Sequence, residues 1–197
     1  MKRIISFALI FIFCLSLLAG CGEEKQNDIV GEWQGEMDYT RAALAAMGLS
    51  GDSEVYFRDA HLSLVMTFSF AADGTYTAKT DETCLKRASV DFIAAVEAGL
   101  LEYMKQEHGV EPDSAEAEAY LAELPTAAEF ASSIAEGTAV SGKYKAEGGK
   151  LYMSADGGIN ENVYETYSIE GDTLTISGSS DPMLNDSGIY PMVFKKQ

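Results

Sequence analysis

The clearest pattern in the chain is an alternation of apolar and polar residues between His61 and Phe70. Successive side chains of a β-strand point to opposite faces, so the pattern predicts a strand with one buried face. Asp73 and Gly74 follow it and tolerate a tight turn, so 74–80 is expected to return as the partner strand of a hairpin. The apolar face of the first strand holds Leu62, Leu64, Met66, Phe68 and Phe70.

A second hairpin pattern occurs twice later in the chain. The segments 144–153 and 167–176 match at tyrosine, glutamate, glycine and leucine positions, so each predicts a strand, a glycine turn and a strand. In all, strands are expected at 29–37, 61–70, 74–80, 138–146, 149–155, 162–169, 172–178 and 188–196. The predicted fold is therefore mainly β, an eight-stranded antiparallel up-and-down barrel whose closure removes exposed edges.

Helices interrupt this series of strands. Over about 83–137 the apolar positions change from the β period to the helical one, which predicts a helical insert between the third and fourth strands, at one rim of the barrel. Asp113 with Glu116, and Thr126 with Glu129, have the spacing of a capping box, so two shorter insert helices are expected to begin there. A short helix is also expected at 40–48, with Thr40 as its cap.

The N-terminus has the layout of a secretory signal. Lys2 and Arg3 precede an apolar run over 4–18, which is too short to span a bilayer comfortably, and small residues follow it. Leu18-Ala19-Gly20-Cys21 resembles the lipobox of bacterial lipoproteins. The resemblance implies cleavage after Gly20 and a diacylglycerol on the Cys21 thiol.

These features divide the chain into three parts: a signal peptide at 1–20, a lipidated tether at 21–28 and a single domain at 29–197. The expected location is the extracytoplasmic face of the cell membrane, where the lipid on Cys21 provides the membrane contact.

Charge limits the partners of the mature chain. Without Lys2 and Arg3 it has 12 basic against 31 acidic residues, a net charge of −19. Such a charge keeps a domain soluble and repels polyanions, so no nucleic-acid partner is expected. The expected partners are an apolar small molecule or a protein of the cell envelope.

No catalytic motif is recognisable. There is no nucleophile elbow, phosphate-binding glycine loop or Cys-x-x-Cys pair, so we expect a protein that is not an enzyme and needs no cofactor or metal. Cys84 is expected to be a small, partly buried residue rather than a nucleophile. His61 and His108 lack neighbouring ligands, and the oxygen-rich segment 156–162 is better explained as a turn than as a calcium loop.

The strand motifs resemble those of the lipocalin-like lipoproteins of bacteria. The residues that carry this resemblance are Gly31-Glu32-Trp33, Asp73-Gly74-Thr75-Tyr76, Glu147-Gly148, Glu170-Gly171 and Phe194-Lys195-Lys196. The resemblance implies that Trp33 plugs the closed end of the barrel. It also implies that a basic residue of the last strand, Lys195 or its neighbour Lys196, packs across the ring, and we take Lys195 as the expected barrel-closing residue.

Such a barrel offers its interior as a candidate site. The expected wall residues are Met66, Phe68, Phe70, Tyr144, Met153 and Tyr167. The alternation fits both a core filled by side chains and a pocket for one small apolar ligand, although bulky inward residues favour the filled core.

Two functions are compatible with these features. In the first, the barrel binds a small apolar ligand in its interior or at its mouth, with the insert as a lid. In the second, the insert or the acidic surface docks a protein of the cell envelope and the barrel is the scaffold.

Overall fold

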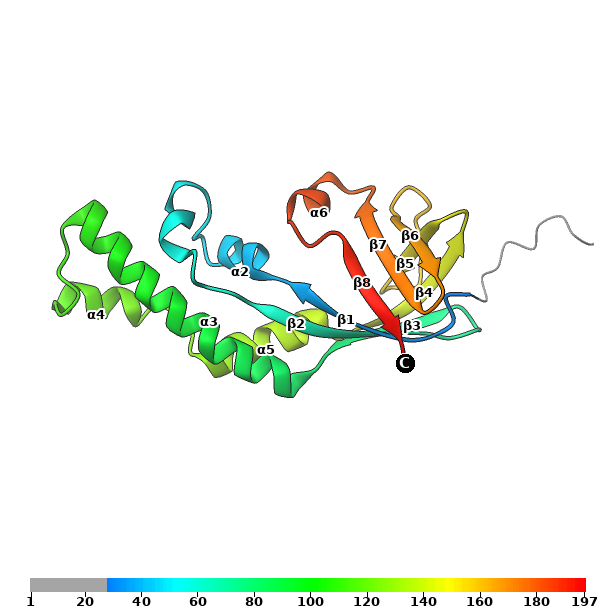
Figure 1. Cartoon of the computed structure of the whole chain (residues 1–197), viewed down its shortest axis with the longest axis horizontal. Coiled ribbons are helices and arrows are strands. Elements are labelled where there is room, and N and C mark those ends of the chain that lie inside the picture. Colours follow the sequence, from blue (N-terminus) through cyan, green and yellow to red (C-terminus); the bar gives the residue numbers. More distant parts are fainter. Residues whose placement is uncertain (1–27) are drawn as a thin grey trace, which may run out of the picture.

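The structure is a computed structural model that describes residues 28–197. Eight antiparallel strands form a closed barrel in sequential order, with β1 beside β8, which confirms the predicted barrel (Figure 1). The strands are β1 (Gly31–Asp38), β2 (Ser63–Phe70), β3 (Thr75–Thr80), β4 (Val140–Glu147), β5 (Lys150–Ser154), β6 (Glu165–Glu170), β7 (Thr173–Ser179) and β8 (Met192–Lys196).

The predicted signal peptide, Cys21 and all but the last residue of the tether lie outside the described residues. Within 28–197, no helix combines the length and the apolar character needed to cross a bilayer.

Two strand starts differ from the sequence prediction, and two short helices were not predicted. The last strand begins at Met192 rather than at 188, because 182–186 forms the helix α6 (Pro182–Asp186) and a loop follows it. Asp181 caps this helix by accepting a hydrogen bond from the Met183 backbone at 2.9 Å. The sixth strand begins at Glu165 rather than at 162. A 3₁₀ helix, η1 (Gly51–Phe57), was not predicted.

The barrel has two different ends. The hairpin turns after β2, β4 and β6 lie at the end where β1 begins and where Trp33 closes the interior. The short helices α2 (Thr40–Ala46) and α6 lie at the opposite, open end, where β1 and β7 finish (Figure 1).

The helical insert lies between β3 and β4 and extends away from the open end of the barrel (Figure 1). We call residues 82–138 the arm. It consists of α3 (Glu82–Tyr103), the π-helical turn η2 (Met104–His108), α4 (Ala115–Leu121) and α5 (Ala127–Thr138). The Oγ1 atoms of Thr80 and Thr138 are 2.6 Å apart, so the arm leaves and re-enters the barrel at one point.

The arm folds as two main helices packed on each other. Phe92 of α3 stacks on Phe130 of α5 with ring centroids 5.2 Å apart, and both side chains are buried. The capping box predicted at Thr126 and Glu129 is confirmed, since the two residues exchange hydrogen bonds at the start of α5. The one predicted at Asp113 is wrong, because the Ser114 hydroxyl caps α4 by accepting from the Ala117 backbone at 3.1 Å. Buried residues of α3 and α5 belong to the same hydrophobic core as those of the barrel. Barrel and arm therefore share one core.

The expected cap of the short helix α2 is wrong. Thr40 is its first residue, and the Asp38 carboxylate accepts the hydrogen bond from the Thr40 backbone at 2.9 Å. The Thr40 hydroxyl instead accepts from the backbone N–H of Leu62 at 2.8 Å and so ties α2 to the chain just before β2. Gly48, with φ of +74°, ends the helix as predicted.

Gly99 sets the distance between η1 and the arm. A Cβ atom at this position would lie 2.6 Å from the Tyr56 carbonyl oxygen and 2.7 Å from the Phe57 ring. The first of these neighbours is backbone and cannot move aside freely. The absence of a side chain at Gly99 therefore allows η1 to pack directly on α3.

We predict that Gly99→Ala lowers the free energy of unfolding by about 1–3 kcal/mol, because the added methyl group forces η1 away from α3. Gly137→Ala is the matched control, since a Cβ atom there meets nothing within 4 Å. In this helix position alanine should raise stability by up to about 1 kcal/mol. Urea unfolding of the two variants measures both effects, and equal changes in both would contradict the close approach at Gly99.

Candidate functional site

The barrel interior is filled around the residues predicted to line a ligand pocket. Met66, Phe68, Phe70 and Tyr144 are buried, and Met153 and Tyr167 are partly buried against the same core. The aromatic rings contact one another. Phe68 lies 5.2 Å from Phe194 and Phe70 lies 4.9 Å from Tyr144, both edge to face. The structure thus brings the predicted wall residues together as packing partners.

Five other inward side chains are completely buried. Trp33, Leu151, Leu174, Ile176 and Phe194 each have 0% of their surface exposed. Side chains that bordered a hollow of ligand size would expose surface to it. Of the two alternatives left open by the sequence, the structure therefore favours the filled core.

The closed end is built around Trp33. Its indole N–H donates to the Ile29 carbonyl at 2.7 Å, and the ammonium of Lys196 lies 5.0 Å from the ring centroid, within the range of a cation–π interaction. Lys195 does not take this place, so that expectation is wrong. Lys196 is opposite Trp33 in the β1–β8 register, whereas Lys195 projects from the other face and donates to Thr173.

A polar cluster joins β6 to the loop before β8 near the open end. The hydroxyl of Tyr190 donates to the carboxylate of Glu165, which shares the inward side of β6 with partly buried Tyr167. The pairing of β6 with β7 shifts its register between Thr166 and Tyr167, one residue after Glu165. Burial raises the pKa of the Glu165 carboxyl, and burial followed by the bond to Glu165 raises the pKa of the Tyr190 hydroxyl.

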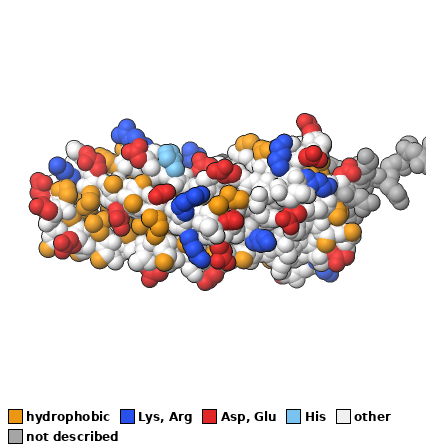
Figure 2. Space-filling view, turned by 60° about the horizontal axis from the view of Figure 1, so that its bottom comes forward, with side chains coloured by type: hydrophobic (Ala, Val, Ile, Leu, Met, Phe, Trp, Pro, Cys, Tyr) orange, Lys and Arg blue, Asp and Glu red, His pale blue; other side chains and the backbone are white. Residues whose placement is uncertain are grey.

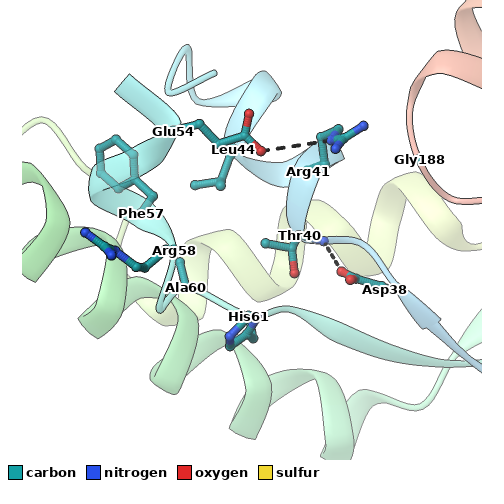
Figure 3. A pocket seen from close by; sticks show the side chains of 10 residues that line it. All are labelled: Asp38, Thr40, Arg41, Leu44, Glu54, Phe57, Arg58, Ala60, His61 and Gly188. Atoms are coloured by element: carbon teal, nitrogen blue, oxygen red, sulfur yellow. Dashed lines mark hydrogen bonds and ion pairs between the residues drawn. The ribbon is translucent and has the colours of Figure 1, made fainter. Parts of the chain in front are cut away.

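The open end also carries a hollow of about 360 Å³, which we call the rim pocket (Figure 3). Its apolar floor is formed by buried Leu44, Phe57 and Ala60. It lies where β1 ends and where the chain passes through α2 and η1 toward β2. The remaining lining residues are Asp38, Thr40, Arg41, Glu54, Arg58, His61 and Gly188.

Opposite charges face each other across the rim pocket. The Arg41 Nε atom lies 4.0 Å from Glu54, and both side chains are largely exposed, so this ion pair contributes little to stability. Hydrogen bonding by Thr40 lowers the pKa of the Asp38 carboxyl, and the charges of His61 and Arg41 add to this effect. Asp38 is therefore held in its charged form.

Arg58 also lines the rim pocket, and its side chain extends away from Arg41 (Figure 3). It forms no ion pair with any residue of the described range 28–197. Its guanidinium has five N–H donors suited to a carboxylate or phosphate. The rim pocket therefore combines an apolar floor with a cation that is open to an anionic group.

Other residues singled out in the sequence lie elsewhere. Cys84 is half-buried in the first turn of α3, and a hydrogen bond to Asp81 raises the pKa of its thiol, which disfavours the nucleophilic thiolate. His108 ends the π-helical turn and packs edge to face on Tyr103. In the loop after β5, Asp156 and Asn160 accept hydrogen bonds from the backbone two residues further on, as in turns.

Comparisons of this chain with protein-family models, with curated proteins and with solved structures find no match. The site must therefore be interpreted from its own geometry.

Sequence reasoning did not predict the two polar sites of the open end, which are the rim pocket and the cluster of Glu165 and Tyr190. Arg41 and Arg58 are distant from Gly188 along the chain, and only the tertiary structure brings the three residues to one pocket. Glu165 did leave a signal, because it alternates with Tyr167 and Ile169 and so places an acid on an inward face.

We predict that Glu165→Gln changes how stability depends on pH. A carboxyl whose pKa is raised by folding stabilises the native state below its ordinary pKa of 4.5 and loses that contribution as pH rises through the folded value. Relative to the wild type, the glutamine variant should therefore gain stability between about pH 4 and about pH 7. Urea unfolding at both pH values measures this gain. If the difference in unfolding free energy between variant and wild type is the same at both pH values, the raised pKa of the Glu165 carboxyl is contradicted.

Proposed function

We propose that the chain is a lipid-anchored, non-catalytic interaction module of the cell envelope. In this proposal the barrel is the scaffold and the arm binds a partner protein. The observation that carries the proposal is the filled interior, because a barrel packed with its own aromatic and aliphatic side chains leaves recognition to the outer surface.

The charge of the arm supports this assignment. The arm contains twelve acidic residues against three basic ones. Figure 2 shows acidic and hydrophobic side chains over the arm end with basic ones among them, and further basic side chains over the middle and the barrel. Complementary charge attracts a partner from a distance and selects against partners of like charge, so the arm suits a partner with a basic surface.

The direction of the arm is also suited to this role. The described chain begins at the closed end of the barrel, and the arm lies at the other end of the long axis (Figure 1). Lipidation of Cys21 would attach the protein to the membrane from the closed end. The arm would then be held away from the membrane surface, where a partner can reach it.

In-cell cross-linking followed by mass spectrometry tests the proposal. The triple variant Glu116→Gln, Glu118→Gln and Glu123→Gln removes exposed charges from α4 and the residues after it. We expect it to lose most of the proteins that cross-link to the wild type, since the attraction to a basic partner is weakened.

The matched control removes three exposed acids at the closed end, through Glu32→Gln, Glu170→Gln and Asp172→Asn, and should keep those partners. Cys21→Ser should release the protein from the membrane fraction. Equal losses in the two triple variants, or cross-links that depend on neither, would contradict recognition by the arm.

A second candidate function is the binding of a small ligand at the mouth of the barrel. The rim pocket favours it, because within about 360 Å³ it offers an apolar floor and the guanidinium of Arg58, which forms no ion pair within residues 28–197. A small molecule with a carboxylate and an apolar body fits this chemistry.

Native mass spectrometry of protein purified from its host tests this candidate. We expect a bound mass that is lost from Arg58→Ala and kept by Arg87→Ala, which removes an exposed arginine of the arm outside the rim pocket. A protein that is consistently free of ligand, or a ligand that both variants retain, would exclude the rim pocket as its site.

A further inference from the structure

The arm has a hollow of its own, separate from the barrel mouth. It measures about 350 Å³ and lies between η1 and α3, and we call it the arm hollow. Small residues of one face of α3 form part of its wall: Ala95, Ala98 and Gly99. The other lining residues are Val55, Tyr56, Arg58, Asp59 and Glu102.

The polar groups of the arm hollow are mainly anionic. Asp59 comes from the chain just after η1, and Glu102 comes from the last turn of α3, so two carboxylates approach it from different elements. Arg58 is the only cation among the lining residues, and it also lines the rim pocket. Glu107 lies close by, since its carboxylate accepts a hydrogen bond from the Tyr56 hydroxyl at 2.5 Å.

Aromatic rings are grouped at the same place. The Tyr56 and Tyr103 rings meet edge to face with centroids 5.4 Å apart, and Tyr103 meets His108 in the same way at 5.3 Å. The bond to Glu107 raises the pKa of the Tyr56 hydroxyl and holds it as a donor. Glu107 and His108 belong to the π-helical turn η2, a feature that often accompanies functional sites.

A hollow with these groups suits a cation. Tyrosine faces attract ammonium groups through their quadrupole, and carboxylates form charge-assisted hydrogen bonds with them. Ala95 and Ala98 present only methyl groups to the arm hollow, which suits an aliphatic side chain lying along α3, whereas Gly99 is covered by η1. The excess of acidic residues on the arm as a whole favours the approach of a basic partner segment.

We propose that the arm hollow receives the ammonium group of a lysine side chain from the partner protein, with Glu102 and Asp59 as its anionic contacts and Tyr56 as its aromatic wall. This inference rests on the proposed function, because it names the chemistry by which the arm recognises its partner.

The test is an NMR titration of the ¹⁵N-labelled full chain in neutral detergent micelles with Nα-acetyl-lysine amide. Its uncharged analogue, Nα-acetyl-norleucine amide, is the ligand control. We expect shifts confined to the amides of residues 55–59 and 95–102 with the lysine compound only. Glu102→Gln should weaken this binding about tenfold, the loss of one charge-assisted hydrogen bond. Tyr56→Leu should weaken it as well.

Glu170→Gln removes an exposed acid of β6 at the closed end, and Tyr120→Leu removes a tyrosine of α4. Both residues are outside the arm hollow, and both variants should leave the affinity unchanged within about twofold. The inference is overturned if the shifts spread over acidic residues throughout the chain, if the norleucine compound produces the same shifts, or if Glu170→Gln weakens binding as much as Glu102→Gln.

The two proposals can fail separately. Cross-links that depend on the α4 acids but persist in Glu102→Gln and Tyr56→Leu would overturn the lysine site and leave the interaction module intact. Specific lysine binding without any arm-dependent cross-link in the host would support the site and contradict the proposed function.

Discussion

The structure depends on one continuous hydrophobic core that extends from the barrel into the arm. Phe57 shows how the two parts are joined, because this fully packed ring belongs to η1, contacts the α3 surface at Gly99 and forms part of the rim-pocket floor. On the arm, Leu85, Phe92 and Val96 are buried in the same core as Trp33 and Phe194 of the barrel. Packing across such a core is non-directional but sensitive to volume, so the position of the arm is fixed by the shape of its neighbours.

This shared core explains why recognition is displaced to the outside of the molecule. The aromatic and aliphatic residues that an open barrel would use to hold a ligand are here in contact with one another. The remaining candidate sites for polar recognition are the rim pocket and the arm hollow, which form where different segments of the chain meet. Arg58 lines both hollows. Its exposed guanidinium is the candidate anion contact of the rim pocket, whereas carboxylates dominate the arm hollow.

Much of the fold could be predicted from local patterns. Alternation identified all eight strands, and the helical period identified the insert, because each depends on residues that are neighbours along the chain. The capping box of Thr126 and Glu129 was predictable for the same reason. The role of Lys196 was predictable in principle, since it lies two residues after inward Phe194 and thus on the same face of β8, whereas Lys195 does not.

The rest depends on contacts between distant segments. The hydroxyl of Thr40 bonds to the backbone N–H of Leu62, a residue far along the chain, and so leaves the capping of α2 to Asp38. Both hollows are formed by segments that only the tertiary structure brings together, and no local pattern marks them.

Native-state hydrogen exchange measured as a function of denaturant tests the shared core most directly. If barrel and arm are one cooperative unit, the slowest amides of α3, around Phe92 and Val96, should exchange only through the same global unfolding as those of β1 and β7. Their opening free energies and denaturant slopes would then coincide. An arm that opens with a lower free energy and a smaller slope while the barrel strands stay protected would contradict this account.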